Sequence, residues 1–281
     1  MRGTPLTLDR PRPARIATFA TSALLVLALI LAPAFASNAR AEDRRPTIAL
    51  VHGAWADSGS WDGVIRRLQA DGYAVYAPPN PLRGLPNDSE AVASFLHTIR
   101  GPIILVGHSY GGVVITNAAV GNARVKALVY VDAFIPARGE TLPELVGYAS
   151  CFAVPDLSTV FNFVPYPGAP PGVFDAYVKP DVFPGCFANG LPDRQAAVLA
   201  ATQRPLSTSA FADASGRPAW KTIPSWAVIG TADHVIPAED QRSMAQRAHA
   251  HVKEITAPHL SMISDPQVVA RAIVRAARRT G

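Results

Sequence analysis

A short turn that carries a serine constrains the fold more than any other feature of this chain. Gly107-His108-Ser109-Tyr110-Gly111-Gly112 follows the apolar run 102–106 and precedes the helical stretch 113–120. The G-x-S-x-G spacing in this context predicts a strand, a sharp turn and a helix, with glycines where side chains would clash across the turn. Such a turn exposes the serine hydroxyl, and the amides at the start of the helix point toward it. A serine presented in this way is suited to attack a carbonyl carbon.

The rest of the chain alternates between short apolar runs and amphipathic stretches. The runs predicted to be strands are 47–52, 73–77, 103–106, 125–131, 225–229 and 252–255. The predicted helices are 60–71, 89–100, 110–121, 238–248 and 266–279. The runs are rich in valine, isoleucine and alanine without a two-residue alternation, as expected of strands that are covered on both faces. The order predicts an α/β domain whose six-stranded sheet is mostly parallel, with helices on both faces.

One segment interrupts this alternation. Residues 136–222 hold twelve of the 26 prolines and many of the aromatic residues of the chain. So long a segment without clear elements is uncommon unless it has a function. We interpret it as a cap that is inserted between the fourth and fifth strand–helix units and lies over the serine. Its aromatic side chains either line a substrate pocket or form the cap's own small core.

The first 41 residues have the organisation of an export signal. Four arginines precede an apolar stretch at 16–36, and small residues follow it. This order predicts a signal peptide at 1–41 and a protein that is exported to the periplasm or secreted. We expect cleavage after Ala41, with Ala36 as the alternative site, and one domain at 42–281. The competing interpretation is an uncleaved membrane anchor, since the apolar stretch is just long enough to span a bilayer.

The charge and the cysteine content limit the kinds of protein that this chain can be. The chain has 26 basic and 21 acidic residues, but the leader holds five of the basic residues and one of the acidic ones. The remainder therefore carries a net charge of only +1, and we predict no nucleic-acid site. Cys151 and Cys186 are the two cysteines. In an exported protein such a pair is a candidate disulfide, and the alternative is two free buried thiols.

Polar residues follow several of the predicted strands. Open α/β sheets place their sites at the carboxyl ends of the strands. Ser109 follows the third predicted strand, Asp132 the fourth, Asp233 the fifth and His259 the sixth. A nucleophile, an acid and a base thus arrive at one edge in the order serine, aspartate, histidine.

At this point the chain resembles the α/β-hydrolase family, over nearly all of residues 46–281. The motifs that carry the resemblance are His52-Gly53 after the first strand, the serine turn, G-x-x-D-x-x-x-P at 230–237 and the late Pro258-His259. The resemblance is strongest to small capped esterases, which include plant methylesterases and hydroxynitrile lyases. It implies the α/β-hydrolase fold without the family's first two strands.

The chemistry assigns a role to each of these residues. Ser109 needs a base within hydrogen-bond reach, which we assign to His259. Asp233 is the carboxylate expected to orient the imidazole, with Asp132 as a possible alternative. The backbone N–H groups of Ala54 and Tyr110 are expected to form the oxyanion hole.

The remaining histidines receive simpler interpretations. We expect His52 to position the oxyanion loop and His108 to pack or hydrogen-bond locally; His234 either lines the site or lies at the surface. No histidine or cysteine cluster has metal-ligand spacing, and no G-x-G-x-x-G follows a strand. We therefore predict no metal and no cofactor.

Together these features predict a serine hydrolase that cleaves a carboxylic ester of a small molecule through an acyl-enzyme. An amide or carbon–carbon bond hydrolase with the same triad is the alternative enzyme, because the triad chemistry is shared. A binding protein that retains the triad is the non-enzymatic alternative. A hydroxynitrile lyase of this type carries a lysine after the catalytic histidine, where this chain has Leu260. The apolar cap favours a hydrophobic acyl or alcohol group, and a membrane contact is expected only through an uncleaved N-terminal segment.

Overall fold

A computed structural model describes residues 45–280. The predicted signal peptide, its two cleavage sites and the alternative membrane anchor lie outside this range. Residues 45–280 belong to one compact unit. Across the described part of the chain, no helix combines the length and the apolar character needed to cross a bilayer.

The main sheet has six strands, and every neighbouring pair in it is parallel. The spatial order is β2-β1-β3-β4-β8-β9. The strands are β1 (Thr47–Val51), β2 (Val75–Tyr76), β3 (Ile103–His108), β4 (Val125–Val131), β8 (Ser225–Gly230) and β9 (His251–Ile255). The predicted α/β fold with a parallel sheet is confirmed, and each strand lies within or beside a predicted run.

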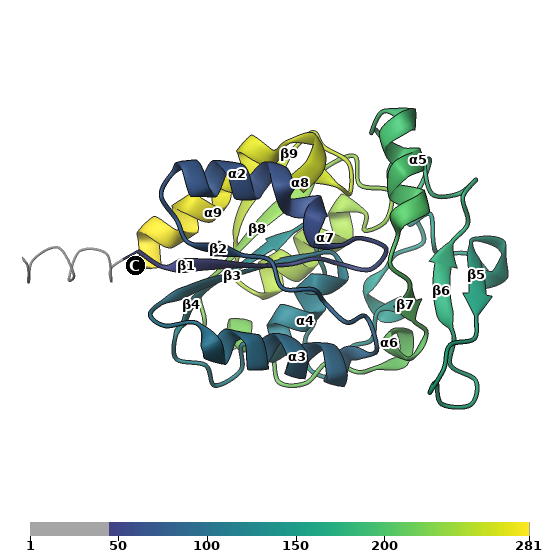
Figure 1. The fold of residues 1–281 in the computed structure, drawn as a ribbon, viewed down its shortest axis with the longest axis horizontal. Coiled ribbons are helices and arrows are strands. Elements are labelled where there is room, and N and C mark those ends of the chain that lie inside the picture. Colours follow the sequence, from purple (N-terminus) through teal and green to yellow (C-terminus); the bar gives the residue numbers. More distant parts are fainter. Residues whose placement is uncertain (1–44, 281) are drawn as a thin grey trace, which may run out of the picture. The chain divides into compact units, whose positions relative to one another are not determined.

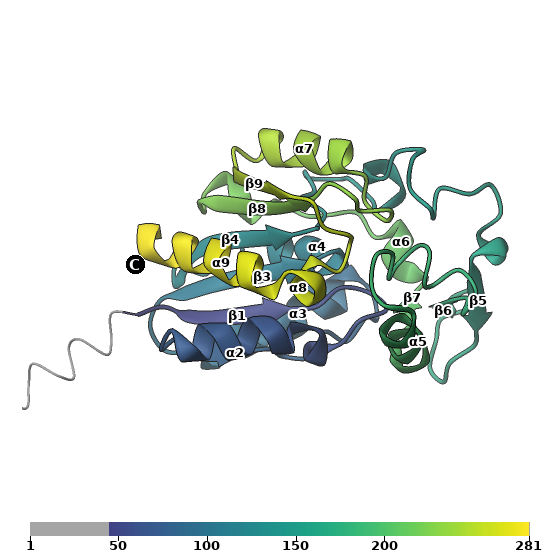
Figure 2. The same cartoon turned by 90° about the horizontal axis from the view of Figure 1, so that it is seen from above.

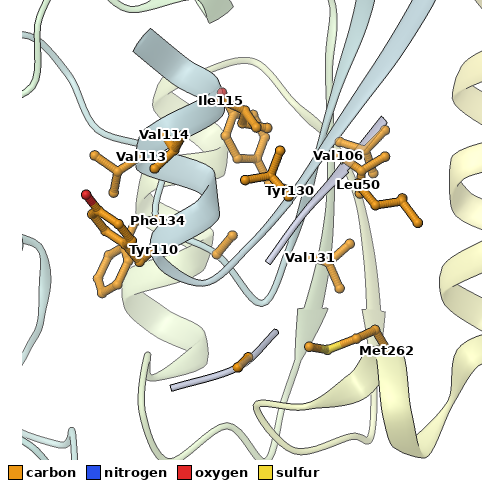
Figure 3. Packing of buried hydrophobic residues seen from close by; sticks show 14 of the residues in the cluster. Leu50, Val106, Tyr110, Val113, Val114, Ile115, Tyr130, Val131, Phe134 and Met262 are labelled. Carbon is orange, nitrogen blue, oxygen red and sulfur yellow. The ribbon is translucent and has the colours of Figure 1, made fainter. Parts of the chain in front are cut away.

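Helices cover both faces of this sheet. Figure 1 shows α2 (Asp62–Ala70) and α9 (Pro266–Thr280) on one face and α3 (Leu85–Thr98) and α4 (Tyr110–Ala118) on the other. The other helices near the sheet are α7 (Ala238–Arg247), which packs on β8, and the short α8 (Ser261–Ser264) and 3-10 turn η1 (Ser58–Trp61). Side chains from α4, β1, β3 and β4 form the central core (Figure 3). This burial gives the sheet a rigid edge on which a site can be built.

Strand β9 departs from the expected burial. The strands β1, β3, β4 and β8 are buried along nearly their whole length, as the apolar runs predict. In β9, four of the five residues are exposed. The prediction of cover on both faces is therefore wrong for β9, and also for β2, where Tyr76 is exposed. These two strands lie at the edges of the sheet, so an apolar residue such as Val252 is exposed because of its position.

The segment between β4 and β8 contains its own elements. It holds a three-stranded antiparallel sheet in the order β5-β6-β7. Its strands and helices are β5 (Phe161–Val164), β6 (Asp175–Val178), α5 (Asp193–Thr202), β7 (Leu206–Ser207) and α6 (Ser209–Ala212), with 3-10 turns η2 (Pro143–Leu145), η3 (Leu157–Thr159) and η4 (Ala219–Lys221). Figures 1 and 2 both place β5, β6, β7 and α5 beyond one end of the main sheet. We call residues 136–222 the cap.

Candidate active site

Ser109 lies in the turn between β3 and α4, with an unusual backbone conformation. Its φ of 51° and ψ of −124° lie outside the regions that L-residues readily adopt. The two glycines of the motif are required by close contacts. A Cβ on Gly107 would lie 2.5 Å from the carbonyl oxygen of Gly111, and a Cβ on Gly111 would lie 2.5 Å from the carbonyl oxygen of Val51. The strained turn therefore exists because the sequence removes these two side chains.

Two backbone N–H groups beside Ser109 are unused. The N–H of Tyr110 begins α4, and the N–H of Ala54 lies in the loop after β1; neither has an acceptor among residues 45–280. Both residues line the same cavity as Ser109. Two free donors beside a serine hydroxyl are suited to bind a developing oxyanion.

His259 is hydrogen-bonded to Asp233. The Nδ1 atom of His259 lies 2.8 Å from Oδ2 of Asp233, and both side chains are fully buried. Three further donors hold the carboxylate: the N–H groups of Val235 and Ile236 at Oδ1, and Nε2 of Gln241 at Oδ2. Burial raises the pKa of Asp233, and these hydrogen bonds act against that rise because they favour the ionised form. The arrangement fixes the orientation of the imidazole.

The proton positions on His259 follow from this contact. Because Nδ1–H donates to Asp233, Nε2 carries the lone pair and can accept a proton. Burial lowers the pKa of His259 to about 3, so the ring is neutral at neutral pH. Nε2 is buried and has no hydrogen-bond partner in the described residues. It is not hydrogen-bonded to the Ser109 hydroxyl in this structure, and such contacts commonly tighten only when substrate is bound.

The contacts of Asp132 do not match the role of the carboxylate that orients His259, for which it was the alternative to Asp233. Its Oδ1 accepts from the N–H of Gly230 at 2.8 Å, and its Oδ2 accepts from the hydroxyl and the N–H of Ser261. Both oxygens of Asp132 therefore bind residues at the end of β8 and the start of α8, while the imidazole is bound by Asp233. The structure thus disfavours Asp132 as the acid, because its oxygens are occupied by donors that hold the backbone.

Two residues of the site were missed in the sequence. Nε2 of His108 donates to the carbonyl oxygen of His259 at 3.0 Å, and the two rings lie 4.7 Å apart. The expectation of a local role for His108 is therefore wrong, and nothing in its spacing signals this contact. Gln241 is the second missed residue. Gln241 is a buried polar side chain on the inner side of α7. A polar residue on the inner side of a predicted helix was the signal in the sequence that could have indicated it.

His52 positions the loop that carries Ala54. Its Nε2 accepts from the N–H of Asn80 at 2.9 Å, so Nδ1 carries the proton and donates to the carbonyl oxygen of Gly53. Asn80 returns a second hydrogen bond from Nδ2 to the carbonyl oxygen of His52. Burial lowers the pKa of His52 to about 4, which keeps this tautomer neutral. His234, by contrast, is exposed and contacts the carbonyl oxygen of Gly185.

The serine opens into an apolar cavity of about 400 Å³ under the cap. Among residues 45–280, no charged side chain lines it, and its walls come mainly from the cap and from the loops after β1 and β4. Trp55 forms part of the wall and stacks on Phe161 of β5, with ring centroids 5.2 Å apart. Such a cavity is the kind of site that binds small apolar molecules.

Cys151 and Cys186 are joined by a disulfide, and both lie in the cap. Among residues 45–280, no group of three histidine, cysteine, aspartate or glutamate side chains is arranged to hold a metal ion. The groups that the site brings together are the Ser109 hydroxyl, the His259 imidazole and the backbone N–H groups of Ala54 and Tyr110.

Two curated proteins share a stretch of sequence with this chain. A carbendazim hydrolyzing esterase from Nocardioides sp. (strain SG-4G) is 34% identical over 110 residues, which cover 34% of this chain and 46% of that protein. A pyrethroid hydrolase from Sphingobium wenxiniae is 35% identical over 108 residues, which cover 34% of this chain and 38% of that protein. The matched stretch thus spans less than half the length of either relative.

The similarity to solved structures extends further along the chain. The crystal structure of polyneuridine aldehyde esterase superimposes with a TM-score of 0.66 and 20% sequence identity, covering 82% of this chain and 98% of that one. At this identity the match establishes the fold. The sequence model of the alpha/beta hydrolase family matches residues 48–272, which is most of the chain. The predicted resemblance is therefore confirmed, and the chain belongs to the alpha/beta hydrolase family.

Proposed function

We propose that this protein is a serine hydrolase that cleaves a carboxylic ester through an acyl-enzyme. The observation that carries the proposal is the His259–Asp233 hydrogen bond, at the same sheet edge as the strained turn of Ser109. Nε2 of His259 takes the proton of the Ser109 hydroxyl as the oxygen attacks the ester carbonyl. The N–H groups of Ala54 and Tyr110 bind the resulting oxyanion.

The same groups complete the reaction. The proton on Nε2 of His259 passes to the alkoxide leaving group, and the alcohol departs, leaving the acyl group on Ser109. A water molecule then gives its proton to Nε2 and attacks the acyl carbon. Collapse of the second oxyanion returns the proton to the Ser109 oxygen and releases the carboxylic acid. Asp233 stabilises the imidazolium in both halves of the reaction.

We propose a neutral, hydrophobic ester of a small molecule as the substrate. In the described part of the chain, no charged residue lines the cavity beside Ser109, so an anionic group would lose its hydration there without compensation. The relatives named for carbendazim and pyrethroid hydrolysis support this class of substrate. Leu260, which follows His259, supports hydrolysis over cyanohydrin cleavage because it supplies no charged group.

We also propose that the protein is exported and that residues 1–41 are removed. The arginine-rich start, the apolar stretch and the small residues before Ala41 support this proposal. The disulfide in the cap supports it as well, since such bridges persist in oxidising compartments. N-terminal sequencing of the protein recovered outside the cytoplasm tests it. A chain that begins at Glu42 is expected, and one that retains Met1 would contradict cleavage.

Turnover of p-nitrophenyl esters of graded chain length tests the proposed function. The wild-type protein is expected to release p-nitrophenol, with a preference for apolar acyl groups. Ser109→Ala is expected to abolish release while leaving the circular dichroism spectrum unchanged, because the serine is a small side chain in a glycine-rich turn. Near-wild-type release by this variant would overturn the proposal, and so would a wild-type protein that binds the esters without cleaving them.

A further inference from the structure

The disulfide lies directly beside two aromatic residues that meet at one tryptophan. Cys151 is followed by Phe152, and Cys186 is followed by Phe187. The Phe152 ring lies 5.0 Å from the Trp55 ring, and the Phe187 ring meets Trp55 edge-on at 5.7 Å. The disulfide joins two segments of the cap, and each segment carries one of these phenylalanine rings. The bond therefore also fixes the two rings relative to each other.

Trp55 connects the cap to the oxyanion donor. It follows Ala54 directly and has a φ of 56°, a conformation that a bulky residue keeps only when its surroundings enforce it. Both of its N–H groups donate to the cap: the backbone N–H to the carbonyl oxygen of Arg204 at 3.0 Å, and Nε1 to that of Ala176 at 2.8 Å. The position of the Ala54 N–H thus depends on the cap through Trp55.

Phe187, which follows the second cysteine of the disulfide, packs on the catalytic base His259. The Phe187 ring lies 5.3 Å from the His259 ring in an edge-on arrangement, and Phe187 is almost fully buried. Phe152, in contrast, lines the cavity. One disulfide is therefore adjacent to a pocket wall on one side and to a ring that packs on the imidazole on the other.

From these contacts we propose that the Cys151–Cys186 disulfide is a positioning element of the active site. It holds Phe152 and Phe187 against Trp55 and His259, and it thereby fixes the cavity wall, the oxyanion loop and the base together. The inference rests on the proposed ester hydrolysis, for which it names a determinant of rate and acyl selectivity. A disulfide that served stability alone would leave both properties unchanged in the folded protein.

The test compares the bridged protein with one that lacks the bridge. Dithiothreitol opens it, as the cysteine sulfurs take up two electrons and two protons and the reagent closes to its cyclic disulfide. Cys151→Ser with Cys186→Ser removes it permanently. For folded protein of either kind, kcat is expected to fall about tenfold, since small displacements of reacting groups cost rate steeply. The preference among p-nitrophenyl acetate, butyrate and octanoate is expected to broaden. Unchanged kcat and an unchanged preference, with near-native circular dichroism, would overturn the proposal.

Substitutions of the phenylalanines leave the disulfide in place. They test the proposal even if the protein does not fold when the disulfide is removed. Phe187→Leu is expected to lower kcat about threefold or more, because the imidazole loses its packing partner. Phe152→Leu is expected to shift the chain-length preference toward longer acyl groups with a smaller effect on kcat. Phe174→Leu is the control, since this exposed cap phenylalanine packs on Phe163, away from Trp55 and His259, and does not line the cavity.

The outcomes are distinguishable. If Phe187→Leu and Phe152→Leu behave like Phe174→Leu, the positioning role is wrong even though ester hydrolysis stands. If the wild-type protein fails to turn over any ester, or if Ser109→Ala turns over as well as wild type, the proposed function itself fails.

Discussion

Nε2 of His108 donates a hydrogen bond to the carbonyl oxygen of His259 at 3.0 Å, and the two rings lie 4.7 Å apart. The bond joins the residue before the nucleophile to the residue that carries the base, across 151 positions of sequence. His108 belongs to β3, a buried central strand, whereas His259 lies in the loop that follows β9. The rigid strand thus holds the backbone of a loop residue, and burial keeps the His108 ring neutral by lowering its pKa.

His108→Leu is expected to impair both stability and rate. The carbonyl oxygen of His259 would be left without this partner, which costs about 1–3 kcal/mol of unfolding free energy for a buried group. The loop would also hold the imidazole less well, so kcat should fall more than KM changes. Urea unfolding and steady-state kinetics measure the two effects. His97→Leu, at an exposed position, is the control; equal behaviour of the two variants would contradict the contact's importance.

Asp233→Asn and Asp132→Asn are expected to have different effects, because Asp233 orients the imidazole of His259 and Asp132 stabilises the fold. An asparagine at 233 favours the wrong tautomer of His259, so kcat should fall by about 10⁴-fold with little change in KM. An asparagine at 132 disturbs the contacts to Gly230 and Ser261 and should mainly lower the melting temperature. Steady-state kinetics and thermal unfolding of both variants decide between them. A greater loss of kcat in the variant at 132 would reverse the assignment of the acid.

The acidic limb of the pH–rate profile is expected below pH 6.5. Protonated His259 cannot accept the Ser109 proton, so kcat/KM falls as the pH falls through the pKa of the free enzyme. Burial lowers this pKa to about 3, which moves the fall to lower pH than for an exposed histidine. Measurements of kcat/KM from pH 4 to 9 on a non-ionising ester test this. A limb centred at or above pH 6.5 would show that the imidazole is not held in a desolvated site.

Loss of the disulfide is expected to destabilise the protein as well as to change its kinetics. Cys151 and Cys186 are 35 positions apart, and closing a loop of this length stabilises a fold by about 2–4 kcal/mol. Guanidinium unfolding of the double serine variant should show a decrease of this order. The oxidised wild-type protein is the reference, and an identical unfolding midpoint for the two would contradict a bridge in the native state.

The main sheet was predictable because its strands are buried apolar runs. Ile103, Ile104, Leu105 and Val106 are all fully buried. The serine that follows them could be placed from the glycine spacing together with the apolar run before it and the helical stretch after it. The order of strands along the chain also placed Asp233 and His259 at the same edge. These inferences depend on local pattern and on a rule of sheet topology, and both are visible in sequence.

The cap and the supporting contacts were not predictable in the same way. The strands β5, β6 and β7 are short, and their pairing joins residues far apart in a proline-rich segment. The bond from His108 to His259 and the cap contacts of Trp55 depend on three-dimensional placement that no periodicity encodes. The burial of β9 was not predictable either, because the sequence of an apolar run at the edge of a sheet resembles that of a run at its centre.

Mass spectrometry of the trapped enzyme shows whether the hydroxyl of Ser109 forms the covalent intermediate. The protein is mixed with a fluorophosphonate, or quenched in acid during turnover of a slow ester, and the modified peptide is identified. We expect a single adduct on Ser109, formed quickly by the wild-type protein, slowly by His259→Ala and not at all by Ser109→Ala. A covalent intermediate on another residue, or hydrolysis without any adduct, would contradict it.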